Sequence, residues 1–269
     1  AKDKDKAMAI YDKAVDKVVE SLSKDSWNQV RKVMGKAVKE LSQIETKYHI
    51  KDAKKVALVG EIYVRRDSFS KRDLIEKMAE RDVVVKISPA LEWIHYCDYL
   101  IKNKVFSSVT DRDKYQAIVV GWFKNYYEKA IKNIFGKLDF YEPHIIDVKE
   151  VMECSEGLIS EKFTGEAILT VGASIHEIAD KVAGVINIGP FGCMPSRIAE
   201  AVLNEKLEEK KSELTLNDKE TQNTLKEFEH LPFISIEVDG SPFSQLVEAK
   251  LESFALQVER VHNHIKGIR

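Results

Sequence analysis

Hydrophobic residues recur every three to four positions through the first fifty residues of the chain. They form two series: Ala7, Ile10, Ala14, Val18 and Leu22, then Val30, Val33, Ala37, Leu41 and Ile44. Between the series, Asp25 and Ser26 provide a helix-start signal. This spacing places apolar side chains on one face of an α-helix. We therefore predict an N-terminal hairpin of two long helices over residues 1–54.

From Lys55 onward the pattern changes to short runs of consecutive apolar, β-branched residues. The runs are VALVG at 56–60, VVVKIS at 83–88, GVINIG at 184–189 and FISIEV at 233–238, each followed by a turn and helical periodicity. Strands that are apolar on both faces and separated by helices are typical of a parallel sheet covered on both sides. We predict an α/β fold: a Rossmann-like parallel sheet of about four strands with helices on both faces and right-handed crossovers.

The segments between the strands complete the expected organisation. One helix over about 70–81 should join the first two strands, and an aromatic-rich helix at 113–138 marks a helical insertion at about 105–160. We expect this insertion, within an α/β domain over 55–269, to pack with the N-terminal hairpin. The charge-dense segment 206–230 predicts a solvated helix and a mobile excursion. The last helix should begin with Ser241 as N-cap and Pro242 at its first position, with Phe243 on its apolar face.

Charge and composition limit the classes of partner that we expect for this chain. The chain has 42 basic and 44 acidic residues, a formal net charge of -2, so no overall field indicates a nucleic-acid or membrane partner. It has no apolar run of bilayer length and no signal peptide at its N-terminus, and we expect a cytoplasmic protein. Because the chain begins at Ala1, we expect it to be a segment of a longer protein.

Cys193 is the most informative of three cysteines. It lies in GPFGCMP, just before a predicted helix start at Pro195. Ligand crevices of such sheets open at the carboxyl ends of the strands, and a helix N-terminus favours the thiolate that attacks electrophiles or binds metal. Alternatively, Cys193 is a small buried residue that fills a turn. Cys97 and Cys154 fall in helical patterns and are expected to be inert core thiols, so one chain should not complete a metal site.

Other residues at the strand ends have a functional and a structural interpretation. Arg65, beside Arg66, could hold a phosphate or carboxylate, or both could be solvated. Arg197 could hold an anion in the first helical turn or lie on the surface. Asp239 could contribute to cofactor binding at the same edge of the sheet, or it could form a simple turn with Gly240.

Glu92 and Trp93 begin the helix that follows Pro89. Glu92 could serve the site or only complement the helix N-terminus, and Trp93 could be a stacking platform or a core residue. Gly192 would let the backbone approach a neighbour. The chain lacks GxxxxGK[ST], a strand-linked GxGxxG, HExxH and GxSxG, which disfavours an autonomous nucleotide hydrolase or a classical hydrolase.

Several segments together resemble one protein family. They are VGEIYVRRDSF (59–69), SPALEWIHY (88–96), GEAILTVGASI (165–175), GVINIGPFGCMPSRIAEAVL (184–203) and VDGSPFSQLVEAKLESFALQ (238–257). In this order they are similar to the C-terminal region of acyl-CoA dehydratase activase-related proteins, which are similar to components of 2-hydroxyacyl-CoA dehydratases. The resemblance spans about residues 55–260.

The resemblance implies that Cys193 is a ligand of a [4Fe-4S] cluster used in ATP-driven electron transfer to acyl-CoA dehydration, as in anaerobic metabolism. It also groups Phe191, Gly192, Met194 and Pro195 with the cofactor site. Cysteine sulfur binds iron and leaves the reduction potential adjustable by its surroundings. The Cys-Pro motifs and the ATP-binding region of the family have no counterpart here. An upstream domain, or a partner ATPase or dehydratase subunit, would have to complete the cluster, and the segment alone would be inactive.

Two alternatives remain open. The chain could be a non-catalytic interaction module that docks such a partner through the aromatic helix, which contains WFKNYY at 122–127. It could also be a small-ligand module that binds acyl-CoA through Arg65, Arg66 and Arg197.

Overall fold

The structure is a computed structural model that describes residues 1–143 and 147–267. The chain forms two compact units: Ala1–Ala53 with Asp111–Ile146, and Lys54–Thr110 with Asp147–Arg269. We call them the helical unit and the α/β unit. The predicted insertion at 105–160 is therefore divided between them, and its residues 144–146 lie outside the described residues.

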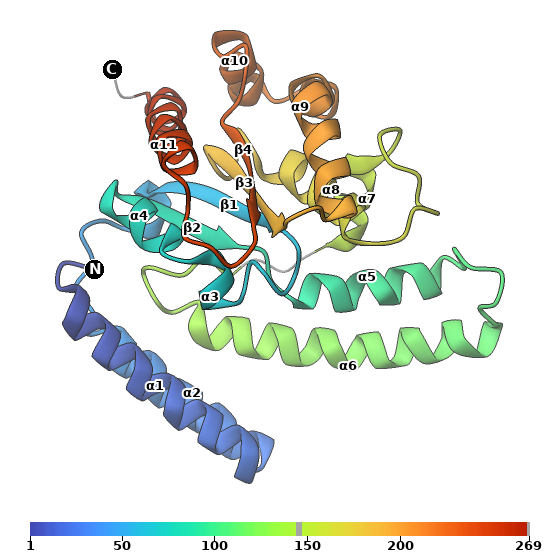
Figure 1. Ribbon diagram of the computed structural model, residues 1–269. Coiled ribbons are helices and arrows are strands. Elements are labelled where there is room, and N and C mark those ends of the chain that lie inside the picture. Colours follow the sequence, from blue (N-terminus) through green and yellow to red (C-terminus); the bar gives the residue numbers. More distant parts are fainter. Residues whose placement is uncertain (144–146, 268–269) are drawn as a thin grey trace. The chain divides into compact units, whose positions relative to one another are not determined.

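The helical unit contains the predicted hairpin. Helices α1 (Lys4–Lys24) and α2 (Trp27–Leu41) pack on each other, and the long helix α6 (Asp111–Phe135) packs on α2 (Figure 1). A short 3-10 helix, η1 (Ile50–Asp52), follows α2 along the chain. Ser26 occupies the N-cap of α2 as predicted. The buried residues of this unit's core include Ala14, Ala37, Val38, Leu41 and Leu138, whereas Leu22 is exposed.

The α/β unit is built on the predicted parallel sheet. Its strands are β1 (Lys54–Gly60), β2 (Val83–Ile87), β3 (Gly184–Pro190) and β4 (Phe233–Val238), in the order β2-β1-β3-β4. Val56 of β1 pairs with Val85 on one side and Gly184 on the other. Because β1 and β3 are central, they carry almost continuous apolar sequence.

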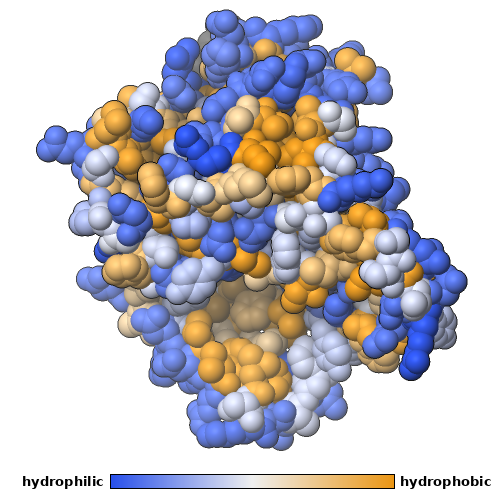
Figure 2. All heavy atoms as spheres, turned by 45° about the vertical axis from the view of Figure 1, so that its right-hand side comes forward, coloured by the Kyte–Doolittle hydropathy of each residue, from blue (hydrophilic) through white to orange (hydrophobic). Residues whose placement is uncertain are grey.

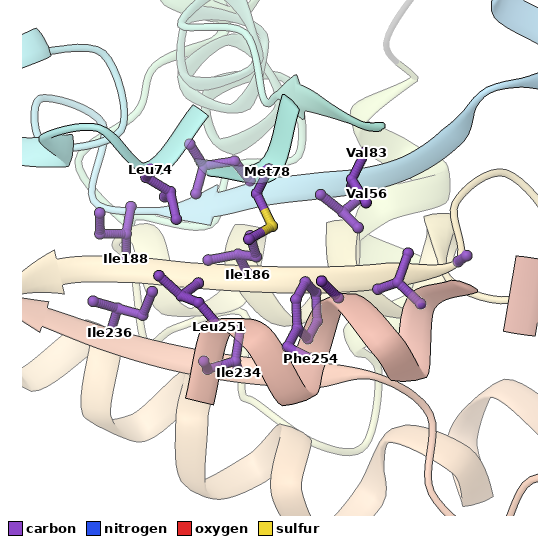
Figure 3. Packing of buried hydrophobic residues seen from close by; sticks show 14 of the residues in the cluster. Val56, Leu74, Met78, Val83, Ile186, Ile188, Ile234, Ile236, Leu251 and Phe254 are labelled. Atoms are coloured by element: carbon purple, nitrogen blue, oxygen red, sulfur yellow. The ribbon is translucent and has the colours of Figure 1, made fainter. Parts of the chain in front are cut away.

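Helices cover both faces of this sheet, as the sequence predicts. One face packs against α4 (Leu74–Glu80) and α11 (Gln245–Ile265), and the other against α8 (Glu166–Glu177) and α9 (Met194–Leu214) (Figure 1). Figure 3 shows Leu74 and Met78 of α4 meeting Leu251 and Phe254 of α11 over Ile186. Helices α5 (Leu91–Lys102), α7 (Val148–Ser155) and α10 (Lys219–Glu227) complete the unit.

Three local predictions are wrong. The helix expected at 70–81 is two helices, α3 (Ser68–Lys71) and α4, because Arg72 adopts a left-handed φ of 50° that ends the first. The segment 206–230 is not an excursion: α9 continues to Leu214, and α10 buries Thr221 and Thr224.

The third concerns the start of the last helix. Helix α11 begins at Gln245, and its N-cap is Ser244, whose side chain accepts a hydrogen bond from the Val247 amide. Ser241, Pro242 and Phe243 precede the helix. The Ser241 amide instead donates to Asp239 at 2.9 Å, so Asp239 closes a turn.

Across the residues described, no helix combines the length and apolar character needed to span a lipid bilayer. Hydrophilic side chains predominate on the face in Figure 2, with hydrophobic groups between them. Helix α6 exposes several aromatic side chains, namely Tyr115, Trp122, Phe123, Tyr126 and Tyr127.

Candidate functional site at the carboxyl edge of the sheet

The carboxyl ends of β1 and β3 lie at the point where the topology reverses. The chain leaves β1 towards α4 on one face of the sheet and leaves β3 towards α9 on the other. Adjacent connections that diverge in this way open a crevice beyond the strand ends. The candidate site is therefore formed by the residues after Gly60 and after Gly189.

Gly60 allows the end of β1 to lie directly against β3. Its φ is 104°, and a Cβ at this position would fall 2.1 Å from the Ile188 carbonyl oxygen. The next amide, that of Glu61, donates to the same oxygen at 2.9 Å. Because a side chain cannot be accommodated there, glycine is required for this close approach.

Arg65 and Glu92 face each other in the interior behind this edge. Each is only 4% exposed, and the shortest distance between their charged groups joins Arg65 Nη2 to Glu92 Oε2 at 3.7 Å. Arg65 also donates from Nη1 to the Gly60 carbonyl at 2.8 Å, while its Nε has no hydrogen-bond partner within the described residues. Burial lowers the pKa of Arg65. This guanidinium links the end of β1 to α5 and is not displayed to solvent.

Burial raises the pKa of Glu92 to about 7, although the charge of Arg65 opposes the shift. Removing a carboxylate from water disfavours its charged form. Near neutral pH the Glu92 carboxyl is therefore present in both its charged and its protonated form. The local expectation that Glu92 only complements the start of α5 misses this pairing.

A further carboxylate, Glu166, was missed by the sequence analysis. Glu166 begins α8 and accepts a hydrogen bond from the Ile62 amide at 3.0 Å; burial raises its pKa. Glu61 accepts from the Val64 amide at 2.6 Å. In the sequence, Glu166 is marked only by its position after Gly165 at a helix start. The fold brings its carboxylate to the end of β1.

Cys193 lies just beyond the end of β3, in the predicted strand-to-helix turn. It is the N-cap of α9, which begins at Met194, and its amide donates to the Pro190 carbonyl at 3.0 Å. The thiol is free and the residue is partly exposed. No side chain caps this helix, and Pro195 has no amide hydrogen, so the amides of Met194 and Ser196 remain directed at the turn.

The residues around Cys193 form a tight, exposed turn. Phe191 is 77% exposed and Met194 62% exposed. The Phe191 amide donates to the Val238 carbonyl at 2.9 Å, and Gly192, with φ 71°, donates to Glu237 at 3.2 Å. These bonds tie the turn to the end of β4.

The arginines considered for anion binding do not form a common site. Arg197 Nη1 lies 2.9 Å from Glu200 and 3.8 Å from Glu237. Arg66 donates to the Ser88 carbonyl at 3.1 Å, and Arg65 is buried against Glu92. Because each guanidinium already has a protein partner, this geometry does not favour an acyl-CoA site built on the three.

Trp93 and Asp239 lie in different surroundings. Trp93 is partly buried, with its ring centroid 5.5 Å from that of the fully buried Tyr96. Asp239 is exposed, and the backbone and side-chain hydrogen bonds from Ser241 lower its pKa.

Asn187 is a second residue that the sequence analysis missed. It is fully buried on β3, and its amide nitrogen lies within 3.0–3.2 Å of Ser235 Oγ, Ser196 Oγ and the Ser196 carbonyl. These contacts connect β3, β4 and the first turn of α9. They position the helix N-terminus on which Cys193 lies.

The other cysteines lie in helices. Cys97 is in α5, and Cys154 is buried in α7 with its Sγ 3.9 Å from His176 Nδ1. Burial raises the pKa of the Cys154 thiol and lowers that of His176. Within residues 1–143 and 147–267, no three His, Cys, Asp or Glu side chains are grouped to hold a metal ion.

Comparison of the chain with models of protein families, with curated proteins and with solved structures found no match.

Proposed function

We propose that the α/β unit belongs to a system of the acyl-CoA dehydratase and activase type, in which Cys193 supplies one ligand of a [4Fe-4S] cluster. The remaining ligands would come from an upstream domain or a partner subunit. The supporting observation is the position of Cys193: a partly exposed free thiol at the N-terminus of α9, at the switch point of a parallel sheet.

The sulfur of Cys193 lies beside the N-terminus of a long helix. The uncapped amides of Met194 and Ser196 and the dipole of α9 place partial positive charge near the sulfur. The thiolate is the form that binds iron. The turn that carries the thiol is held by bonds to Val238, Glu237 and Pro190, so the sulfur has a defined position.

The residues of this chain do not fit a complete cluster. Cys193 has no companion ligands grouped with it in the part of the chain that the structure describes, and Cys154 is directed at His176. One thiolate does not hold a four-iron cluster. The proposal is therefore limited to ligand donation, and the rest of the site must be external to these residues.

Ligand exchange from a preformed cluster tests this proposal with the chain alone. A [4Fe-4S] cluster held by a small soluble thiol is offered anaerobically to the wild type and to Cys193→Ser, and protein-bound iron and sulfide are measured after desalting into buffer that contains the same thiol. Soluble thiols can fill the other three positions, so the wild type should retain cluster and Cys193→Ser should not.

Cys97→Ser and Cys154→Ser are the matched controls, since each removes one thiol from the same unit. Both should retain iron at the wild-type level. Equal iron in all four proteins, with or without the thiol at position 193, would refute the proposed role.

A second candidate is a non-catalytic module that docks a partner subunit through α6. It is favoured by the aromatic side chains that α6 exposes, with Trp122 at 65% and Phe123 at 51%. Exposed aromatic residues are enriched in the energetic centres of protein interfaces. A dehydratase or ATPase subunit that binds Cys193→Ser as tightly as wild type, but binds Trp122→Ser weakly, would support docking over cluster ligation.

A further inference from the structure

Two adjoining cavities lie along the seam where α2 packs against α6 in the helical unit. Their volumes are about 560 and 490 Å³, and both are lined by Arg31, Ile134 and Lys137. We treat them as one site and call it the α2–α6 groove. Volumes of this size are typical of small-molecule sites.

The groove is lined by cations without acidic partners. Arg31, Lys32 and Lys39 come from α2, and Lys129 and Lys137 from α6 and the turn after it; no Asp or Glu is among the lining residues. Across residues 1–143 and 147–267, none of these five side chains has a hydrogen bond or ion pair. The acidic residue of α2, Glu40, instead binds Lys17 of α1 at 2.6 Å. Unneutralised like charges disfavour the folded state, and an anionic ligand would relieve that repulsion.

The spacing of the cations suits more than one phosphate group. Arg31 and Lys39 are separated by eight residues of α2, a rise of about 12 Å. Gly35 lies between them in the groove wall, and a Cβ there would meet nothing within 4 Å. Glycine in a helix interior costs about 1 kcal/mol relative to alanine. No packing contact requires this glycine, and it leaves the backbone open to the groove.

An aromatic ring also lines the groove. Tyr126 lines the second cavity and is 48% exposed, with its ring stacked on Trp122 at a centroid distance of 6.3 Å and an interplanar angle of 19°. Asn133 lines the same wall. Exposed aromatic rings beside cations stack nucleobases, and side-chain amides hydrogen-bond to base edges.

We propose that the α2–α6 groove binds a nucleotide that carries two or more phosphate groups. The base stacks on Tyr126, and the phosphate chain lies across Arg31 and Lys137 towards Lys32 and Lys39. The row of cations is too short for a nucleic-acid strand, because single-strand-binding folds cover about four or more nucleotides. The site is independent of Cys193 and of the proposed cluster.

Calorimetric titration tests the site with four probes: ADP, pyrophosphate, inorganic phosphate and a thymidine oligonucleotide. ADP should bind the wild type more tightly than either inorganic anion, and the affinity should fall with added salt. The variant Arg31→Gln/Lys137→Gln should bind ADP at least about tenfold more weakly. Tyr126→Leu should weaken ADP but leave pyrophosphate unchanged, because only the base stacks.

The matched control is Lys13→Gln/Lys36→Gln, which removes two positive charges from α1 and α2 outside the groove lining. It should bind ADP within about twofold of wild type, and circular dichroism should show both double variants folded. An equal loss of affinity in the two double variants would overturn the proposal, since the attraction would then be general. No heat with ADP, an unchanged ADP affinity in Tyr126→Leu, or tighter binding of the oligonucleotide than of ADP would each also overturn it.

Discussion

The buried Glu92 carboxyl should make the α/β unit less stable as pH rises. Its pKa is raised from 4.5 to about 7, so the folded protein holds this proton more tightly than the unfolded chain does. The protonated form therefore stabilises the fold, and that contribution is lost as pH rises from the unfolded value through the folded one. A shift of this size corresponds to about 3 kcal/mol in the free energy of unfolding.

Glu92→Gln isolates this contribution, because glutamine resembles the protonated acid in size and cannot ionise. Relative to the variant, the wild type should have similar stability near pH 4.5 and should be less stable by about 3 kcal/mol near pH 8. Arg65 has the further carboxylates Glu61 and Glu166 among its electrostatic neighbours, so the variant retains partial charge compensation.

Urea unfolding at constant ionic strength measures the difference. Trp93 adjoins the substituted residue. Once Trp27 and Trp122 are replaced by phenylalanine, the fluorescence of Trp93 reports the unfolding of the α/β unit alone. Glu80→Gln, at an exposed position of α4, is the control and should reproduce the wild-type pH profile. Parallel profiles for wild type and Glu92→Gln between these pH values would refute the reasoning.

Three further outcomes are expected. Gly60→Ala should lower the free energy of unfolding by at least about 2 kcal/mol, since its Cβ would strike the Ile188 carbonyl, and Gly157→Ala, with positive φ but open surroundings, should cost less; equal losses in urea melts would contradict this. Lys211→Met should cost about 2 kcal/mol, because the buried ammonium binds the Ile175 carbonyl at 2.9 Å and Asp180 at 3.0 Å at the end of α8. Lys206→Met, at a partly exposed position of α9, should change stability by less than about 0.5 kcal/mol, and a similar loss for both variants in thermal melts would rule out a stabilising role of Lys211 at the end of α8. Maleimide labelling followed by mass spectrometry should modify Cys193 before Cys154, whose burial raises its thiol pKa; the reverse order would be incompatible with the described exposures.

Much of the α/β fold could be predicted from local sequence. The four apolar runs are strands, and the signals at Ser26 and Pro195 mark true helix starts within one residue. These predictions succeeded because apolar periodicity and helix-end chemistry act over a few residues. The prediction failed at Arg72, where a non-glycine residue adopts a left-handed conformation that no local signal marks.

The partners of the polar residues were not predictable in the same way. Arg65 and Glu92 were considered separately, yet they form one buried pair, and Glu166 reaches the same strand end from more than seventy residues beyond Glu92. The balanced net charge likewise concealed the α2–α6 groove, because averaging over the chain cancels cations that the fold gathers on one seam.

By itself, the sequence determined the strands, most helices and the location of Cys193 at a strand-to-helix turn, since each depends on neighbours along the chain. Only the tertiary structure decided which charges are paired. Crossovers and helix packing bring together residues from distant segments, and Coulomb and desolvation energies depend on those spatial distances and on burial. Arg65 is therefore a buried structural cation, whereas Arg31 lines an open groove. The residues next to each arginine along the chain do not reveal this difference in burial.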